Sequence, residues 1–175
     1  FCYCVFFFFF LCCFFFFYLS GDHRDRPEIA RRQRQMCIRD RAKVVLGLSG
    51  GVDSAVVASL AAAAFGPEQV TAVRMPYRTS SSESLDHARL VVDALGIREQ
   101  TIDISAAVDG YAAASGDTPT AARLGNVMAR TRMLALFDRS AALNALPLGT
   151  GNKSERLLGY FTWHADDAPP VNPIG

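Results

Sequence analysis

Residues 42–175 contain no cysteine, because all five cysteines of the 175-residue chain lie between Cys2 and Cys37. This absence excludes a disulfide and a thiolate zinc site within that stretch, and it fits a reducing cytoplasm. A marked excess of one charge is also missing. Seven of the 18 Lys/Arg and four of the 17 Asp/Glu precede residue 42, which leaves 11 basic and 13 acidic side chains. These residues therefore carry a net charge of −2, and the formal net charge of the whole chain, +1, argues neither for nor against an anionic partner.

The first 41 residues differ sharply from the rest of the chain. They hold ten of the 13 phenylalanines, and residues 1–19 form an unbroken apolar run. The length of that run would permit a transmembrane helix, with the basic stretch 24–41 as its cytoplasmic flank. A secretory signal fits poorly, because no basic region precedes the run and no clear small-residue cleavage site follows it.

We prefer a third interpretation, in which residues 1–41 are a non-native low-complexity and adaptor-like segment. Natural spans mix Leu, Ile, Val, Ala and Gly, whereas this run is nearly all Phe and Cys, as a translated poly-T tract would be. Residues 35–41 resemble translated sequencing adaptor, and the chain begins without Met. We therefore expect one domain at 42–175 and no membrane contact. A membrane anchor is the main alternative.

From residue 43 onward, short β-branched apolar runs alternate with longer helical patterns. Gly66-Pro67 and Gly96 are typical stop signals after two of the helical patterns. Residues 105–115 are rich in alanine, residues 165–175 predict a loop, and no internal repeat is present. The expected strands are 43–48, 69–75, 98–104 and 145–148, and the expected helices are 54–65, 82–95, 124–143 and a last one that starts within 154–160.

This alternation predicts an α/β domain, with a doubly wound parallel sheet of four to five strands, flanking helices and right-handed crossovers. In such sheets the ligand lies at the carboxyl ends of the strands. Three loops of unusual composition fall at those ends, namely 49–54, 76–84 and 149–155. We therefore expect these loops to form a single site.

The loop after the first expected strand has the features of a phosphate-binding turn. Its glycines let backbone N–H groups approach an anion, and the following helix adds free donors and partial positive charge. Ser49 and Ser54 can donate to phosphate oxygens, whereas the Asp53 carboxylate needs a bridging Mg²⁺ ion to lie beside phosphate. Neither a Walker A motif nor a Gly-x-Gly-x-x-Gly fingerprint is present. The structural alternative is a plain strand-to-helix turn with Ser54 as the N-cap.

The string Ser-Gly-Gly-Val-Asp-Ser at 49–54 resembles the PP-loop of the N-type ATP pyrophosphatases. That superfamily cleaves ATP to AMP and pyrophosphate on an adenine nucleotide α-hydrolase-like, Rossmann-like fold. Segments 75–84, 125–133, 148–155 and 159–162 further resemble the NAD synthetases, and the resemblance covers residues 43–175. The Tyr-Arg-Thr-Ser-Ser string at 77–81 is more similar to their ammonia-dependent branch.

The resemblance implies a set of site residues. Asp53 and Glu155 would hold magnesium, and Asp53 and Lys153 would act in catalysis, the lysine by neutralising phosphate. Asn126, Arg130, Trp163 and Asp166 would bind the dinucleotide substrate, Arg130 across a dimer interface. ATP would be bound by Gly47, Leu48, Ser49, Gly50, Gly51, Val52, Asp53 and Ser54, together with Arg74 and Thr150.

Simpler roles remain open for several of these side chains. Arg130 and Arg132 lie two apart on a helix and point to different faces, so one can reach a ligand while the other packs, or both can be solvated. Glu155 could serve only the helix dipole, and Lys153 could be solvated. Trp163-His164 stands where many family members have Lys-Tyr, and Pro169-Pro170 replaces Gly-Asp. These departures leave the contacts of that loop open.

The reaction implied by the resemblance is the ATP-dependent amidation of deamido-NAD with ammonia, through an acyl adenylate, to NAD, AMP and pyrophosphate. A cytoplasmic homodimer is implied, without a nucleic-acid partner. The chain ends within a family motif, so we expect a C-terminal truncation and a fragment that could be inactive. Alternatives are a GMP synthetase-like or tRNA thiolase-like enzyme, although the latter would bring cysteines or zinc ligands, and a non-catalytic nucleotide-binding module.

Overall fold

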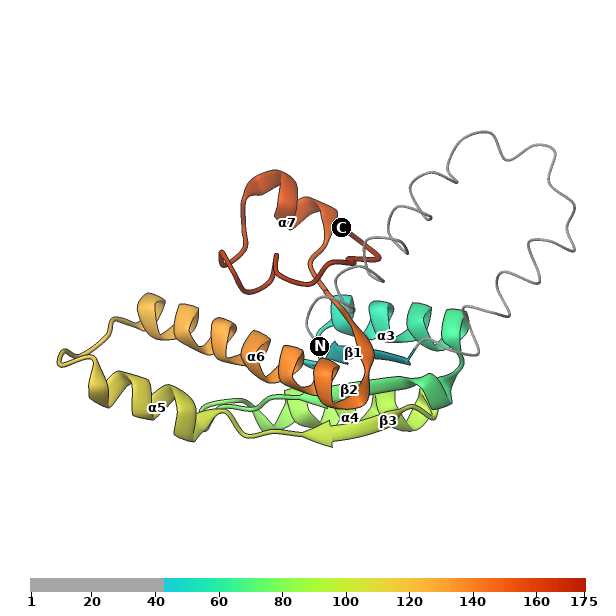
Figure 1. Cartoon of the computed structure of the whole chain (residues 1–175), viewed down its shortest axis with the longest axis horizontal. Coiled ribbons are helices and arrows are strands. Elements are labelled where there is room, and N and C mark those ends of the chain that lie inside the picture. Colours follow the sequence, from blue (N-terminus) through green and yellow to red (C-terminus); the bar gives the residue numbers. More distant parts are fainter. Residues whose placement is uncertain (1–42) are drawn as a thin grey trace, which may run out of the picture. The chain divides into compact units, whose positions relative to one another are not determined.

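The computed structural model describes residues 43–175, so all three interpretations of residues 1–41 lie outside the described part of the chain. Four parallel strands form one sheet in the order β3-β2-β1-β4, which confirms the predicted doubly wound α/β fold (Figure 1). The strands are β1 (Lys43–Gly47), β2 (Val70–Arg74), β3 (Arg98–Thr101) and β4 (Ala145–Leu148).

The strand order places β1 between β2 and β4, with Val44 opposite Val70 and Leu46 opposite Leu148. The chain therefore moves outward from β1 to β3 and then returns to the other side of β1 to form β4. This reversal is a topological switch point, at which the loops after β1 and β4 diverge and leave room for a ligand.

Five α-helices accompany the strands in residues 43–175: α3 (Val52–Phe65), α4 (Ser82–Leu95), α5 (Ser105–Ala114), α6 (Ala121–Leu143) and α7 (Lys153–Leu158), with a 3₁₀ turn at Pro67–Gln69. Within that range no helix is both long and apolar enough to cross a bilayer. The bounds of α4 and β4 are those predicted. Strand β3 is shorter than predicted and ends at Thr101, although the N–H groups of Ile102 and Ile104 still donate to the carbonyls of Arg74, the last residue of β2, and of Pro76 beyond it.

Alternation along the central strand separates two hydrophobic cores. Val44 and Leu46 of β1 pack with Val57 and Ala61 of α3 and with residues of α4. Val45, which points to the opposite face, packs with Leu136 of α6 and residues of α5. The sheet is thus covered on both faces, as the apolar strands β1, β2 and β4 predict.

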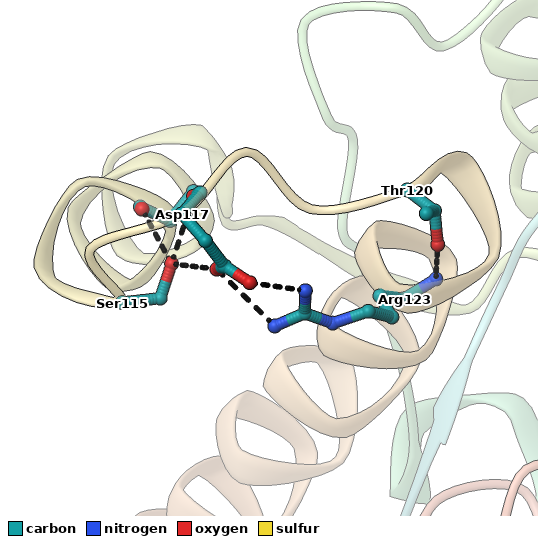
Figure 2. Close-up of polar contacts among 5 residues, drawn as sticks. Ser115, Asp117, Thr120 and Arg123 are labelled. Carbon is teal, nitrogen blue, oxygen red and sulfur yellow. Dashed lines mark hydrogen bonds and ion pairs between the residues drawn. The ribbon is translucent and has the colours of Figure 1, made fainter.

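Helices α5 and α6 form an antiparallel pair, and the loop that connects them, residues 115–120, lies at the left end of the pair in Figure 1. Figure 2 shows the contacts that hold this loop: Arg123 donates from Nη1 and Nη2 to the Asp117 carboxylate at 2.6 and 3.3 Å. The Ser115 hydroxyl donates to Asp117 Oδ1, and the Arg123 N–H donates to Thr120, the N-cap of α6. The Arg123 and Ser115 hydrogen bonds lower the pKa of the Asp117 carboxyl.

We expect Asp117→Asn to lower the thermal midpoint slightly at neutral pH and to have no effect in acid. Because the folded-state pKa of Asp117 is depressed, its contribution is present above the unfolded pKa and is lost as the pH falls below about 4. Melting curves of both proteins between pH 7 and 3 should converge toward acid. A difference that stayed constant over this range would contradict the ion-pair origin.

Candidate nucleotide site

The loop between β1 and α3 is closed by its own serines. The Ser54 hydroxyl donates to the Gly51 carbonyl at 2.9 Å, accepts from the Ser49 N–H at 3.3 Å and lies 3.1 Å from the Ser49 hydroxyl. Gly51 occupies the N-cap position of α3 without any side-chain cap. The simple alternative of Ser54 as an N-cap is therefore wrong, because this buried side chain instead braces the turn that precedes the helix.

Gly50 brings this loop against the start of α4. Its φ of 86° lies in the left-handed region, and a Cβ there would lie 2.1 Å from the carbonyl oxygen of Ser84. Both the backbone conformation and the space thus require glycine at this position. The contact joins the phosphate loop to the segment that follows β2.

The second half of the site is the loop between β4 and α7. Asn152 caps α7 by accepting from the Glu155 N–H at 2.9 Å, and the Glu155 carboxylate accepts in return from the Asn152 N–H at 2.9 Å. Gly149 packs against Asn172, whose Oδ1 would lie 2.0 Å from an added Cβ. The C-terminal segment therefore fits closely over the end of β4.

The two loops meet through one side chain and enclose a cavity. Asn152 donates from Nδ2 to Asp53 Oδ2 at 3.4 Å, across 99 residues of sequence. A cavity of about 500 Å³ opens beside this contact. Its lining comes from the phosphate loop, the β4–α7 loop and the segment after α7: Ser49, Gly51, Asp53, Ser54, Thr150, Gly151, Glu155, Gly159, Tyr160, Phe161, Thr162 and Asp166.

Helix α6 holds the segment after α7 from outside the cavity. Asn126 and Arg130 lie one turn apart on the same helix face. Thr162 Oγ1 donates to Asn126 Oδ1 at 3.3 Å, and Arg130 Nε donates to the Trp163 carbonyl at 3.2 Å. The Thr162 N–H in turn donates to Asp166 at 3.0 Å. Asn126 and Arg130 therefore contact the cavity wall and are not among its lining residues.

Arg132 serves a different region from Arg130, as their spacing predicts. Its Nε donates to the Met75 carbonyl at 3.1 Å, at the end of β2. Burial lowers the pKa of this guanidinium, while the nearby Asp166 charge acts in the opposite direction. Arg132 thus packs locally and joins α6 to the residue that follows β2.

The predicted site residues divide into those that line the cavity and those that do not. Ser49, Gly51, Asp53, Ser54, Thr150, Glu155 and Asp166 are brought together there. Gly47 ends β1, Leu48 and Gly50 lie between β1 and α3, and Val52 begins α3, so these four predicted residues are near the cavity but do not line it. Trp163 exposes 66% of its surface beside Phe161 and His164, and Lys153 is also exposed.

Arg74 lies elsewhere. It forms an ion pair with Glu99 and donates to the Leu85 carbonyl and the Thr101 hydroxyl, which ties β2 to β3 and α4. Its Nε is buried without a partner among the described residues. The structure therefore does not bring Arg74 to the cavity.

The 76–84 loop, expected in the same site, contributes no lining side chain. It is held instead by α5: the buried Tyr77 hydroxyl donates to Asp109 at 2.9 Å, and Arg78 donates to the other carboxylate oxygen at 2.9 Å. Burial, reinforced by the Asp109 hydrogen bond, raises the pKa of the Tyr77 phenol. This loop meets the phosphate loop where Ser84 approaches Gly50.

Sequence reasoning missed the cavity residues from Gly159 to Thr162 and the bridging role of Asn152. The Gly-Tyr-Phe-Thr string at 159–162 supports the family resemblance, but nothing in its composition assigns it to a cavity wall. Asn152 did carry a signal, because Asn-x-x-Glu before a helix is the capping-box pattern. That pattern predicts the cap and not the contact with Asp53.

Two carboxylates, those of Asp53 and Glu155, face the cavity. Such a pair suits a cation that a nucleotide also binds better than a cation that the protein binds alone. Within residues 43–175 no group of three or more His, Cys, Asp or Glu side chains could hold a metal ion. Asp53 and Glu155 nevertheless face one cavity. Magnesium is commonly bound by one or two carboxylates together with substrate phosphates, so this pair fits such an ion.

Comparison with known proteins identifies the family. A family model described as NAD synthase matches residues 33–175. The NH(3)-dependent NAD(+) synthetase of Chlorobaculum tepidum is 57% identical over 132 residues, which cover 75% of this chain and 47% of that protein. The chain spans about half the length of the curated relatives it matches.

Solved structures share the fold. An NH3-dependent NAD synthetase from Campylobacter jejuni superposes with a TM-score of 0.73 at 43% identity, over 81% of this chain and 62% of that one. An NMN synthetase from Francisella tularensis superposes with a TM-score of 0.72 at 31% identity, over 86% and 65% of the two chains. The family match spans the phosphate loop, both carboxylates and the cavity wall, and the chain therefore belongs to the NAD synthase family.

Proposed function

We propose that the protein amidates deamido-NAD with ammonia at the expense of ATP and forms NAD, AMP and pyrophosphate. The observation that carries this proposal is the shared cavity, in which a Ser-Gly-Gly-Val-Asp-Ser loop and two carboxylates lie together at the switch point of the sheet. Membership of the NAD synthase family and the ammonia-dependent relatives support the choice of substrates. A GMP synthetase or a tRNA thiolase would belong to another family.

In the first step of the proposed reaction, a carboxylate oxygen of deamido-NAD attacks the α-phosphorus of ATP. The new O–P bond forms as the bond to the β-phosphate oxygen breaks, and pyrophosphate leaves. Ser49, Gly51 and Ser54 of the phosphate loop line the cavity where the phosphates would lie. Their role is to position ATP and to stabilise charge on the leaving group.

A magnesium ion bound by Asp53, Glu155 and phosphate oxygens would neutralise charge on the pyrophosphate. Lys153 is exposed, and we include it only as a source of positive charge near the cavity. In the second step ammonia attacks the acyl carbon, the carboxylate oxygen leaves with AMP, and ammonia loses a proton. No protein nucleophile is required.

The dinucleotide is proposed to lie against the wall that α6 supports. Asp166 lines the cavity, while Asn126 and Arg130 contact the segment on its outer side. Trp163 offers an exposed aromatic surface to a nicotinate ring. A cytoplasmic homodimer completes the proposal, and the exposed Leu134 and Phe137, which lie one turn apart on α6, support a protein contact there.

The test is to incubate the purified chain with ATP, Mg²⁺, ammonia and deamido-NAD and to quantify nucleotides by chromatography. We expect NAD and AMP in equal amounts, dependent on ammonia. Nicotinate mononucleotide is the matched competing substrate, because an NMN synthetase shares the fold. Preferential use of the mononucleotide, release of ADP, or nucleotide binding without turnover would contradict the proposal.

A further inference from the structure

Asn152 is the point at which the two halves of the site are joined. Its Nδ2 donates to Asp53 Oδ2 at 3.4 Å, its Oδ1 accepts from the Glu155 N–H at 2.9 Å, and its own N–H donates to Glu155 Oε2 at 2.9 Å. One residue therefore contacts both carboxylates of the cavity.

Neither carboxylate is held by a cationic side chain within residues 43–175. The ion pairs in this range join Arg74, Arg78, Arg89, Arg123 and Arg139 to other acids. Two like charges that face one cavity repel each other unless a cation or a fixed donor holds them. Asn152 supplies neutral donors to both of them.

The chemistry of asparagine explains why this side chain suits both tasks. Serine, threonine and aspartate can all cap a helix by accepting a backbone hydrogen bond. Asparagine combines a carbonyl acceptor for the cap with an NH₂ donor for a carboxylate. Aspartate would place a third negative charge beside Asp53, and serine is too short to cap α7 and reach Asp53 at once.

We propose that Asn152 is a positioning residue that fixes the separation of Asp53 and Glu155 for a divalent cation bound with the phosphates of ATP. This inference rests on the proposed function for the identity of the nucleotide. Replacing a residue that hydrogen-bonds a metal ligand commonly weakens metal binding by about 10- to 100-fold.

The experiment measures binding of Mn²⁺ to the full chain by electron paramagnetic resonance, in the presence of the non-hydrolysable analogue α,β-methylene ATP. Asn152→Ser keeps the helix cap and removes the donor to Asp53, so we expect about 10-fold weaker Mn²⁺ binding with an unchanged melting temperature. Asn152→Asp should weaken binding of the analogue even when Mn²⁺ is absent, because this substitution adds negative charge beside the phosphates. Asn152→Ala, which removes the cap too, is the matched control for α7.

Wild-type affinity for Mn²⁺ in Asn152→Ser would overturn the inference, as would a wild-type chain that binds no Mn²⁺ with the analogue. A loss confined to Asn152→Ala would show that only the cap matters and would overturn it too. The proposed function fails separately: a chain that binds Mn²⁺ through Asn152 but makes no NAD would contradict the reaction and leave the positioning role intact.

Discussion

Asp53→Ala is expected to lower Mg²⁺-dependent release of pyrophosphate from ATP by about 100- to 1,000-fold, the range found when one preorganised stabilising group is removed. The carboxylate lies in the first turn of α3, on the cavity wall, where its only hydrogen bond within residues 43–175 is the long one from Asn152. Its loss should therefore remove a metal ligand and little structure. Pyrophosphate release, followed in a coupled phosphate assay, measures the effect.

The stability of Asp53→Ala should change by less than about 1 kcal/mol, because only a helix-dipole interaction and a weak hydrogen bond are lost. Asp86→Ala, which removes an exposed carboxylate from α4, is the matched control and should retain wild-type activity. Pyrophosphate release by Asp53→Ala at the wild-type rate would contradict the metal-binding role.

Gly50→Ala is the second substitution for which we expect a large effect. A non-glycine residue in the left-handed region costs about 1–2 kcal/mol, and displacing the Ser84 carbonyl adds roughly 1–3 kcal/mol. The phosphate loop and the start of α4 must move apart to relieve the contact. We therefore expect destabilisation of about 2–5 kcal/mol in chemical denaturation and a loss of ATP binding.

Gly51→Ala tests whether the destabilisation expected for Gly50→Ala is specific to position 50. The neighbouring Gly51 has a φ of −83°, and an added Cβ would meet only the Ser49 hydroxyl, at 3.4 Å. This variant should fold with nearly wild-type stability. Equal destabilisation by both substitutions would mean that the close approach of Gly50 to Ser84 does not govern the loop.

The sequence predicts the centre of the sheet well because β1 and β2 are buried on both faces, whereas β3 is a polar and mostly exposed edge strand. The apolar runs from Lys43 and Ala145 have no competing helical period, and Gly96 ends α4 in the left-handed conformation as expected. The alanine-rich residues 105–115 predict no definite element, because alanine gives almost no contrast between buried and exposed faces. The structure shows that Val108 supplies the buried contact of this helix, α5.

The sequence predicts those parts of the site that lie at the carboxyl ends of the strands. In a parallel sheet the loops that follow neighbouring strands lie at the same edge, so the loops after β1 and β4 come together. Asp53 and Glu155 therefore line one cavity, as the sequence predicts. The position of Arg74 depends on Glu99 and Thr101, partners that no local pattern reveals. The hydrogen bond between Asn152 and Asp53 likewise spans 99 residues, and only the folded chain shows it.

The most direct test of the central claim follows the carboxylate oxygen of deamido-NAD. Deamido-NAD labelled with ¹⁸O in that carboxylate is incubated with the chain, ATP, Mg²⁺ and ammonia, and AMP is analysed by mass spectrometry. Attack on the α-phosphorus followed by ammonolysis predicts one ¹⁸O atom in each AMP and NAD in equal amount. Unlabelled AMP, or label found only in pyrophosphate or inorganic phosphate, would contradict the acyl-adenylate reaction proposed for this cavity.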